Sequence, residues 1–148
     1  MKRSAGVLLH RRRNGKIEVL LGHPGGPYWE QKDAGAWSIP KGEYGEEEDP
    51  MDAARREFQE ETGIRLDGEL APLGEVKQAG GKVVRAFALE RDCDPTNLRS
   101  NTFALEWPPH SGKEQDFPEI DRFEWFSLEE ARIKLLKAQV AFLDRLGP

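Results

Sequence analysis

Residues 40–64 constrain the fold of this chain more than any other segment, because they combine strong helix boundaries with crowded acidic side chains. The stretch reads PKGEYGEEEDPMDAARREFQEETGI. Asp49 is suited to the N-cap of a helix, Pro50 to its first position, and Gly63 to the left-handed residue that ends it. These signals predict a helix over residues 50–62.

Three glutamates fall on one face of this predicted helix. At about 100° per residue, Glu57, Glu60 and Glu61 lie within an arc of roughly 100°. They repel one another, and the helix dipole disfavours negative charge in the last turns. An acidic face is usually only solvated, but Mg²⁺ or Mn²⁺ would offset both penalties, since these cations prefer carboxylate oxygens. The face therefore indicates a divalent metal site.

The other faces of the predicted helix carry apolar and small side chains. Met51 and Phe58 lie together on a face that we assign to the core. Ala53 and Ala54 flank the acidic face. Because their side chains are small, we expect them to leave room for a ligand to approach the glutamates.

Composition excludes several classes of protein. The formal net charge is −5 and the pI is near 5.3, so binding of duplex nucleic acid mainly through its phosphates is not expected. The single cysteine, Cys93, allows no internal disulfide, and its neighbours do not favour a nucleophilic role. The apolar run at residues 5–9 is too short for a signal peptide, and no run approaches a membrane span. We expect a cytoplasmic protein.

The rest of the chain predicts strands, two long loops and a second helical region. Asn14-Gly15 is a hairpin signal between the first two strands, because both residues tolerate positive φ. A capping box at Ser127–Glu130 opens a C-terminal helix that we expect to break near Lys137. The expected strands are 4–10, 17–22, 37–39, 74–78, 82–90, 101–107 and 120–126, and the long loops are 22–35 and 107–119. This pattern predicts one α+β domain over residues 1–148, with a mixed or antiparallel sheet flanked by helices.

The acidic segment also carries a known motif. Residues 42–64 match the Nudix box, G-x5-E-x7-R-E-U-x-E-E-x-G-U, where U is a bulky aliphatic or aromatic residue. The matching residues are Gly42, Glu48, Arg56, Glu57, Phe58, Glu60, Glu61, Gly63 and Ile64. The first strand AGVLL, the W-x-x-P-K-G before the box and the late F-E-W-F-S-L-E-E-A look like the same family. The chain resembles a Nudix hydrolase, which implies an α/β/α sandwich with a mixed central sheet.

The resemblance implies hydrolysis of a phosphoanhydride bond in a nucleoside diphosphate linked to a further group, with water and Mg²⁺ or Mn²⁺. In the family, the positions of Glu57, Glu60 and Glu61 hold the metals. A backbone carbonyl at the start of the box, here that of Lys41 or Gly42, joins them. This allocation agrees with the chemistry, because a bound metal polarises phosphate oxygens and lowers the pKa of water.

Other positions are implied to support the site. Glu48 and Arg56 match a pair that braces the box, and Gly42 and Gly63 match structural glycines. Three cations are candidates to assist in binding a polyanionic substrate: Lys41, Arg3 and Arg85.

One further carboxylate is expected from the late loop, as a metal ligand or as the base that takes the proton of the water. Glu119 is our candidate, because it lies six residues before Trp125 and follows the stiffening residue Pro118. Glu114 lies in a Gly/Ser/Lys stretch, and we interpret it as solvated.

The substrate class is indicated less sharply. The segments PKG and AARREFQEETGI look most like the branch acting on dinucleoside polyphosphates, so a dinucleoside polyphosphate or a nucleoside triphosphate is the best match. The ADP-ribose branch carries a proline past the box, where this chain has residues 79–81, and inositol pyrophosphates favour a more basic site. Tyr28, Trp29 or Trp107 could stack on a nucleobase, whereas Trp37 and Trp125 are assigned to the core.

Three other classes stay open, as does the oligomeric state. A Nudix-fold module that binds ligands without hydrolysis would be expected to lack the glutamates, which are all present. An isomerase of allylic diphosphates would need a catalytic cysteine in the pocket, and Cys93 lies in a polar, Asp-flanked stretch. A decapping enzyme would need a basic track for RNA, and the acidic pI of this chain argues against such a track.

Overall fold

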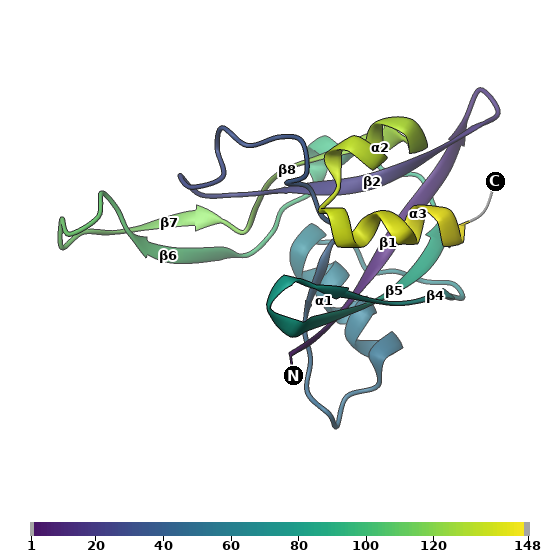
Figure 1. Ribbon diagram of the computed structural model, residues 1–148, viewed down its shortest axis with the longest axis horizontal. Helices are drawn as coiled ribbons and strands as arrows, with labels where there is room; N and C mark the ends of the chain where they lie inside the picture. The colour runs from purple at the N-terminus through teal and green to yellow at the C-terminus, as the bar shows by residue number, and fades with distance from the viewer. Residues whose placement is uncertain (1, 147–148) are drawn as a thin grey trace.

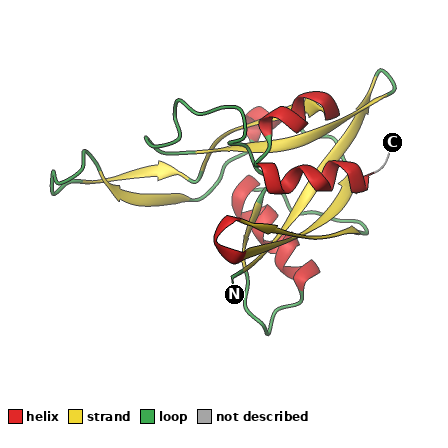
Figure 2. Cartoon of the chain, in the orientation of Figure 1, coloured by secondary structure: helices red, strands yellow, loops and turns green. Residues whose placement is uncertain are grey.

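The computed structural model describes residues 2–146. Figures 1 and 2 show how its strands and helices are arranged in space. The elements in chain order are β1 (Arg3–Arg13), β2 (Lys16–Pro24), β3 (Lys41–Glu43), α1 (Pro50–Thr62), β4 (Ala71–Gln78), η1 (Ala79–Gly81), β5 (Lys82–Glu90), η2 (Pro95–Asn97), β6 (Thr102–Glu106), β7 (Glu114–Pro118), β8 (Ile120–Ser127), α2 (Leu128–Lys134), η3 (Lys137–Gln139) and α3 (Val140–Leu146).

The central sheet is mixed, as the sequence predicts. Its strands run in the order β4-β5-β1-β2-β8, and the short β3 pairs with β1. β1 and β5 are parallel, and the remaining pairs are antiparallel. Asn14 and Gly15 join β1 to β2 with φ values of 51° and 78°, which confirms the predicted hairpin turn.

Helices cover both faces of this sheet, because successive side chains of a strand point to opposite faces. From β1, Val7 and Leu9 pack in the apolar cluster that contains Phe58 of α1. Leu8 packs in the other cluster, with Phe142 of α3. The α/β/α arrangement implied by the family resemblance is therefore confirmed, with α1 on one side of the sheet and α3 on the other.

Ala53 and Ala54 were expected to leave space beside the glutamates, and this expectation is wrong. Both side chains are fully buried in the same cluster as Phe58. Small residues at these positions let α1 approach the sheet closely, so they serve packing and not access.

The predicted loop 107–119 is also wrong in part, because it contains β7. β6 and β7 form a separate two-stranded sheet, which Figure 1 shows extending away from the central sheet. Phe103 and Phe117 face each other across this hairpin with ring centroids 6.1 Å apart. The cross-strand aromatic pair favours strand pairing over a free loop.

Two smaller boundaries differ from the prediction. The strand expected at residues 37–39 consists of isolated bridges, from Ser38 to Gly22 and from Trp37 to Leu135. The C-terminal helix is confirmed with its capping box at Ser127, and so is its interruption near Lys137, since the helix resumes as α3 at Val140; α2 itself already ends at Lys134. Among residues 2–146, no helix combines the length and the apolar character that crossing a membrane requires.

Candidate active site

The helix α1 begins and ends where the sequence predicts. The Asp49 side chain accepts hydrogen bonds from the backbone N–H groups of Met51 and Asp52, at 3.1 and 3.2 Å. Gly63 has a φ of 82°, the left-handed conformation that glycine adopts without strain. These caps fix the length of α1 and thereby the direction in which its glutamates project.

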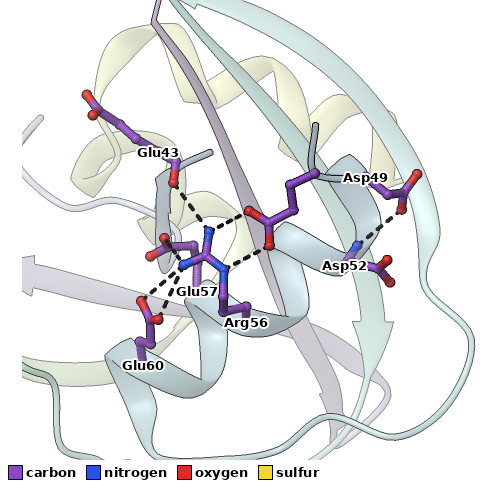
Figure 3. A network of polar contacts seen from close by, with 7 residues as sticks. Glu43, Asp49, Asp52, Arg56, Glu57 and Glu60 are labelled. Atoms are coloured by element: carbon purple, nitrogen blue, oxygen red, sulfur yellow. Dashed lines mark hydrogen bonds and ion pairs between the residues drawn. The ribbon is translucent and has the colours of Figure 1, made fainter. Parts of the chain in front are cut away.

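Arg56 supplies the positive charge on the acidic face. Its Nε and Nη2 donate to the two carboxylate oxygens of Glu48, both at 2.8 Å. Its Nη1 donates to Glu57 at 2.8 Å and to Glu60 at 3.3 Å, and Figure 3 shows both carboxylates turned toward the guanidinium. The hydrogen bond from Arg56 lowers the pKa of Glu48. The guanidinium therefore links the loop before α1 to the face that carries the glutamates.

Glu57 reaches back to β3 because residue 42 is a glycine. A β-carbon built on Gly42 would lie 1.9 Å from an Oε atom of Glu57, so no other residue fits without moving the carboxylate. Burial raises the pKa of Glu57, and the hydrogen bond from Arg56 opposes this shift. The close approach holds one carboxylate of α1 against the start of the box.

Glu61 is the most strongly perturbed carboxylate of the face. Its Oε2 accepts a hydrogen bond from the backbone N–H of Lys41 at 3.2 Å. Burial raises the pKa of Glu61 to about 8; the positive charge of Lys41 opposes this shift, and the negative charge of Glu119 adds to it. A bound cation would relieve this penalty, because it would stabilise the ionised form.

Glu119, the residue between β7 and β8, comes to the site from a segment far from α1 in the sequence. Its backbone N–H donates to Asn101 and its carbonyl accepts from Gly25, both at 2.9 Å. Partial burial, followed by the charge of Glu60, raises the pKa of Glu119. The residue lines a pocket of about 220 Å³ together with Glu61 and Lys41. By contrast, Glu114 pairs with Glu106 at the far end of the β6–β7 hairpin.

The two arginines predicted to assist the substrate lie elsewhere. Arg3 and Arg85 both pair with Glu75 of β4, at 2.8 and 3.1 Å. Neither of them lines the pocket of Glu61 and Glu119. Their contact with the substrate stays a prediction, and the structure adds no support to it.

An aromatic pocket adjoins the Glu119 pocket. It has a volume of about 360 Å³, and both pockets are lined by Pro24, Trp29 and Glu119. Tyr28 also lines it and is exposed, with its ring packed edge-on against Trp107 at 5.3 Å. The loop after β2 therefore places aromatic side chains in a pocket that adjoins the pocket of the carboxylates.

The remaining tryptophans and the cysteine lie outside this group. Trp37 is buried, as predicted. Trp125 is only half-buried; its indole N–H donates to the carbonyl of Cys93 at 3.0 Å. Burial raises the pKa of the Cys93 thiol, and its pocket contains no residue of the box.

The donor set fits a hard divalent cation by its chemistry, because it consists of carboxylates on one helix face and one across from it. Within residues 2–146, however, no three ligating side chains are gathered into a compact set. Glu57 and Glu60 are turned to Arg56, and Glu61 is turned to the N–H of Lys41. The guanidinium thus neutralises carboxylates that a cation would draw together.

Sequence reasoning missed the wall of the pocket opposite α1. Ser38, Ile39 and Leu136 line it. Leu136 follows the end of α2 and is held by a hydrogen bond from its N–H to the carbonyl of Trp37 at 2.8 Å. No motif marks these residues, and only the tertiary contact between two distant segments brings them together.

A mixed sheet between helical layers, with an acidic helix after a short strand that begins with Lys41-Gly42, is the architecture of one class of hydrolase domain. The NUDIX domain family matches residues 1–146, and the chain belongs to this family.

Individual relatives are similar over part of their length. The RNA pyrophosphohydrolase of Rhizobium meliloti (strain 1021) is 32% identical over 109 residues, 64% of this chain and 60% of that protein. The RNA pyrophosphohydrolase of Bartonella henselae is 31% identical over 108 residues, 63% of this chain and 57% of that protein. The match therefore spans about three fifths of these relatives. A crystal structure of a C. elegans Ap4A hydrolase binary complex is similar in fold, with a TM-score of 0.65, 24% identity and coverage of 99% and 95% of the two chains.

Proposed function

We propose that this chain is a pyrophosphohydrolase that cleaves a phosphoanhydride bond in a nucleoside 5′-polyphosphate compound. One observation carries the proposal: Glu61 of the α1 face and Glu119 from a distant segment line one pocket together with Lys41. Carboxylates that raise one another's pKa at a pocket are typical of a functional site. A surface face with no function would not explain why Glu119 joins it.

The cofactor in this proposal is Mg²⁺ or Mn²⁺, held by Glu57, Glu60 and Glu61 with the backbone carbonyl of Lys41. When bound, such a cation neutralises charge on the phosphates and lowers the pKa of water. Its binding requires Glu57 and Glu60 to share or release their hydrogen bonds with Arg56. The bidentate contact of Arg56 with Glu48 can persist through this change, because it uses Nε and Nη2.

Other residues of the chain would activate the water and bind the phosphates and the nucleobase. Glu119, which lies across the pocket from α1, is the candidate to accept the proton of the attacking water or to add a metal ligand. The ammonium group of Lys41, which lines the same pocket as Glu61 and Glu119, would contact the phosphates. Trp29 and Tyr28 offer faces for a nucleobase.

The best-supported substrates are a dinucleoside polyphosphate or a nucleoside triphosphate, because the aromatic pocket next to the carboxylates fits a nucleobase beside its phosphates. A second candidate is the 5′-triphosphorylated end of RNA, which the similarity to two RNA pyrophosphohydrolases favours. Both share a nucleoside 5′-polyphosphate as the reacting group.

The test is a panel of nucleoside triphosphates, dinucleoside polyphosphates, 5′-triphosphorylated RNA, ADP-ribose and inositol pyrophosphates, each with Mg²⁺ and Mn²⁺. We expect hydrolysis of at least one nucleoside 5′-polyphosphate and complete loss of activity in excess EDTA. Activity that persists in EDTA would contradict the metal assignment. Binding without hydrolysis across the panel would favour the alternative of a ligand-binding module.

A matched pair of variants tests the role of Glu119. We expect Glu119→Gln to lower kcat by about 10²-fold or more at saturating Mg²⁺, as loss of a general base does. Glu114→Gln serves as the control, because Glu114 lies on the hairpin away from the pocket. The kcat of both variants is measured across pH. If kcat falls strongly in Glu114→Gln and stays near the wild-type value in Glu119→Gln, we chose the wrong residue.

A further inference from the structure

A second pocket lies directly behind the wall that the sequence did not reveal. It has a volume of about 600 Å³ and is formed between the β4–β5 turn and η3, which Figure 1 shows next to each other. Its lining residues are Gln78, Ala79, Lys82, Leu136, Lys137 and Ala138. Leu136 also lines the pocket of Glu61 and Glu119. The two pockets are therefore neighbours that share one side chain.

The shared wall is fixed by a buried amide. Gln139, the last residue of η3, is fully buried. Its Oε1 accepts a hydrogen bond from the backbone N–H of Ile39 at 3.0 Å. Because a backbone N–H can only donate, the oxygen of this amide must face Ile39. Its NH₂ group must then face the other way, where it donates to Gln78 Oε1 at 2.8 Å.

This arrangement determines which end of Gln78 is available to a ligand. Its oxygen is already engaged by Gln139, so its NH₂ group is the end left for the pocket that Gln78 lines. Among residues 2–146, no hydrogen bond of that NH₂ group to another protein group is found. The pocket therefore gains a fixed hydrogen-bond donor without a protein partner.

Two lysines add positive charge at the same pocket. Lys82 and Lys137 are both exposed, and in the part of the chain that the structure describes neither forms an ion pair with a carboxylate. Lys41 lines the neighbouring pocket of Glu61 and Glu119. Each of the two neighbouring pockets therefore carries positive charge, from Lys41 in one and from Lys82 and Lys137 in the other.

We propose that this pocket, which we call the lysine pocket, binds the second nucleoside phosphate of a dinucleoside polyphosphate. The inference rests on the proposed function and specifies its substrate. Polar groups at the pocket are hydrogen-bond donors, which suits the acceptor-only oxygens of a phosphate. Ala79, Leu136 and Ala138 offer an apolar surface to a sugar or base. With the aromatic pocket on one side and the lysine pocket on the other, the carboxylates stand between two binding sites.

The kinetic test compares two substrates, of which only one carries a second nucleoside. The double variant Lys82→Ala/Lys137→Ala should lower kcat/KM for diadenosine tetraphosphate about tenfold or more, through KM, since charge-assisted hydrogen bonds are lost. Its kcat/KM for ATP should fall much less than that for diadenosine tetraphosphate, because ATP has no second nucleoside. The control Lys16→Ala/Lys113→Ala removes the same charge from two hairpin turns. An equal loss for both substrates, or no loss for either, would overturn the proposal.

A binding test keeps this inference separate from the proposed activity. In EDTA, AMP is titrated into the ¹⁵N-labelled protein, and we expect the side-chain NH₂ signals of Gln78 to shift. Gln78→Glu keeps an oxygen for Gln139 but replaces the NH₂ group by a second oxygen, so it should weaken AMP binding while the Tm stays near the wild-type value. The backbone signals of Ala79 and Ala138 report on the pocket in this variant.

The outcomes are distinguishable. If AMP shifts the lysine-pocket signals but no substrate is hydrolysed, the proposed function fails and the binding site stands. If diadenosine tetraphosphate is hydrolysed but AMP shifts only the signals of Tyr28 and Trp29, the lysine pocket is refuted and the proposed function stands.

Discussion

The pocket of Glu61 and Glu119 has two walls that are built by opposite means. The α1 wall is ionic: its carboxylates repel one another and are held in place by the guanidinium of Arg56. The wall formed by Ser38, Ile39 and Leu136 is neutral, and the buried amide of Gln139 holds it through hydrogen bonds to the backbone and to another amide. The first wall can change its charge and contacts with a bound cation or with pH. The second wall has no charged group to titrate, and its hydrogen bonds keep it in place.

The largest effect should come from removing a charge from the ionic wall. Glu61→Gln keeps the size of the side chain and an oxygen for the N–H of Lys41, so the fold should be retained. We expect kcat to fall by roughly 10²–10⁴-fold, because a metal ligand is lost from the reacting site. Steady-state kinetics at saturating Mg²⁺ measure this. A normal kcat would remove Glu61 from the proposed metal site.

A smaller effect should follow from removing the group that organises the ionic wall. Arg56→Ala deprives Glu48 of its bidentate partner and Glu57 of its counter-charge. We expect a lower Tm together with a loss of roughly 10–100-fold in activity, as for residues that orient metal ligands. Glu48→Gln, which weakens only the bracing contact, is the control and should lose less of both. A kcat loss with an unchanged melting curve would mean that Arg56 acts on the substrate.

The neutral wall should respond in stability before activity. Gln139→Ala leaves the buried N–H of Ile39 without its acceptor, which costs about 1–3 kcal/mol in the free energy of unfolding. The exposed Gln31→Ala is the control. Urea unfolding of the two variants measures the difference. Equal stability would show that water or a neighbouring group replaces the amide, and that the wall is less fixed than its contacts indicate.

The same contrast between the two walls explains which parts of the site could be predicted from the sequence. The α1 wall is local, so the spacing of Glu57, Glu60 and Glu61 and the caps at Asp49 and Gly63 could be predicted from one segment. The β-prone runs and the Asn14-Gly15 turn signal likewise predict strands of the central sheet, because both are properties of short segments of the chain.

The neutral wall could not be predicted, because Ile39 and Gln139 are one hundred positions apart and neither belongs to a pattern. Glu119 lies between these cases. Its spacing from Trp125 suggested it, but only the pairing of β8 with β2 shows that it reaches the pocket. β6 was predicted as a strand, but β7 was missed because the Gly- and Pro-containing turn before it resembles a free loop.

The smallest predicted effect is a dependence of the metal-free stability on pH. Burial raises the pKa of Glu61 to about 8, whereas in the unfolded chain a glutamate ionises near pH 4.3. Between these values the unfolded state releases the proton first, so the contribution of Glu61 to stability falls as pH rises. Glu61→Gln should therefore raise the Tm in EDTA by a few degrees at pH 8 and by little at pH 4.5, with the exposed Glu69→Gln as control. The same change in Tm at both pH values would mean that the Glu61 carboxylate is not strained by its burial, and the ionic wall would then need no cation to relieve it.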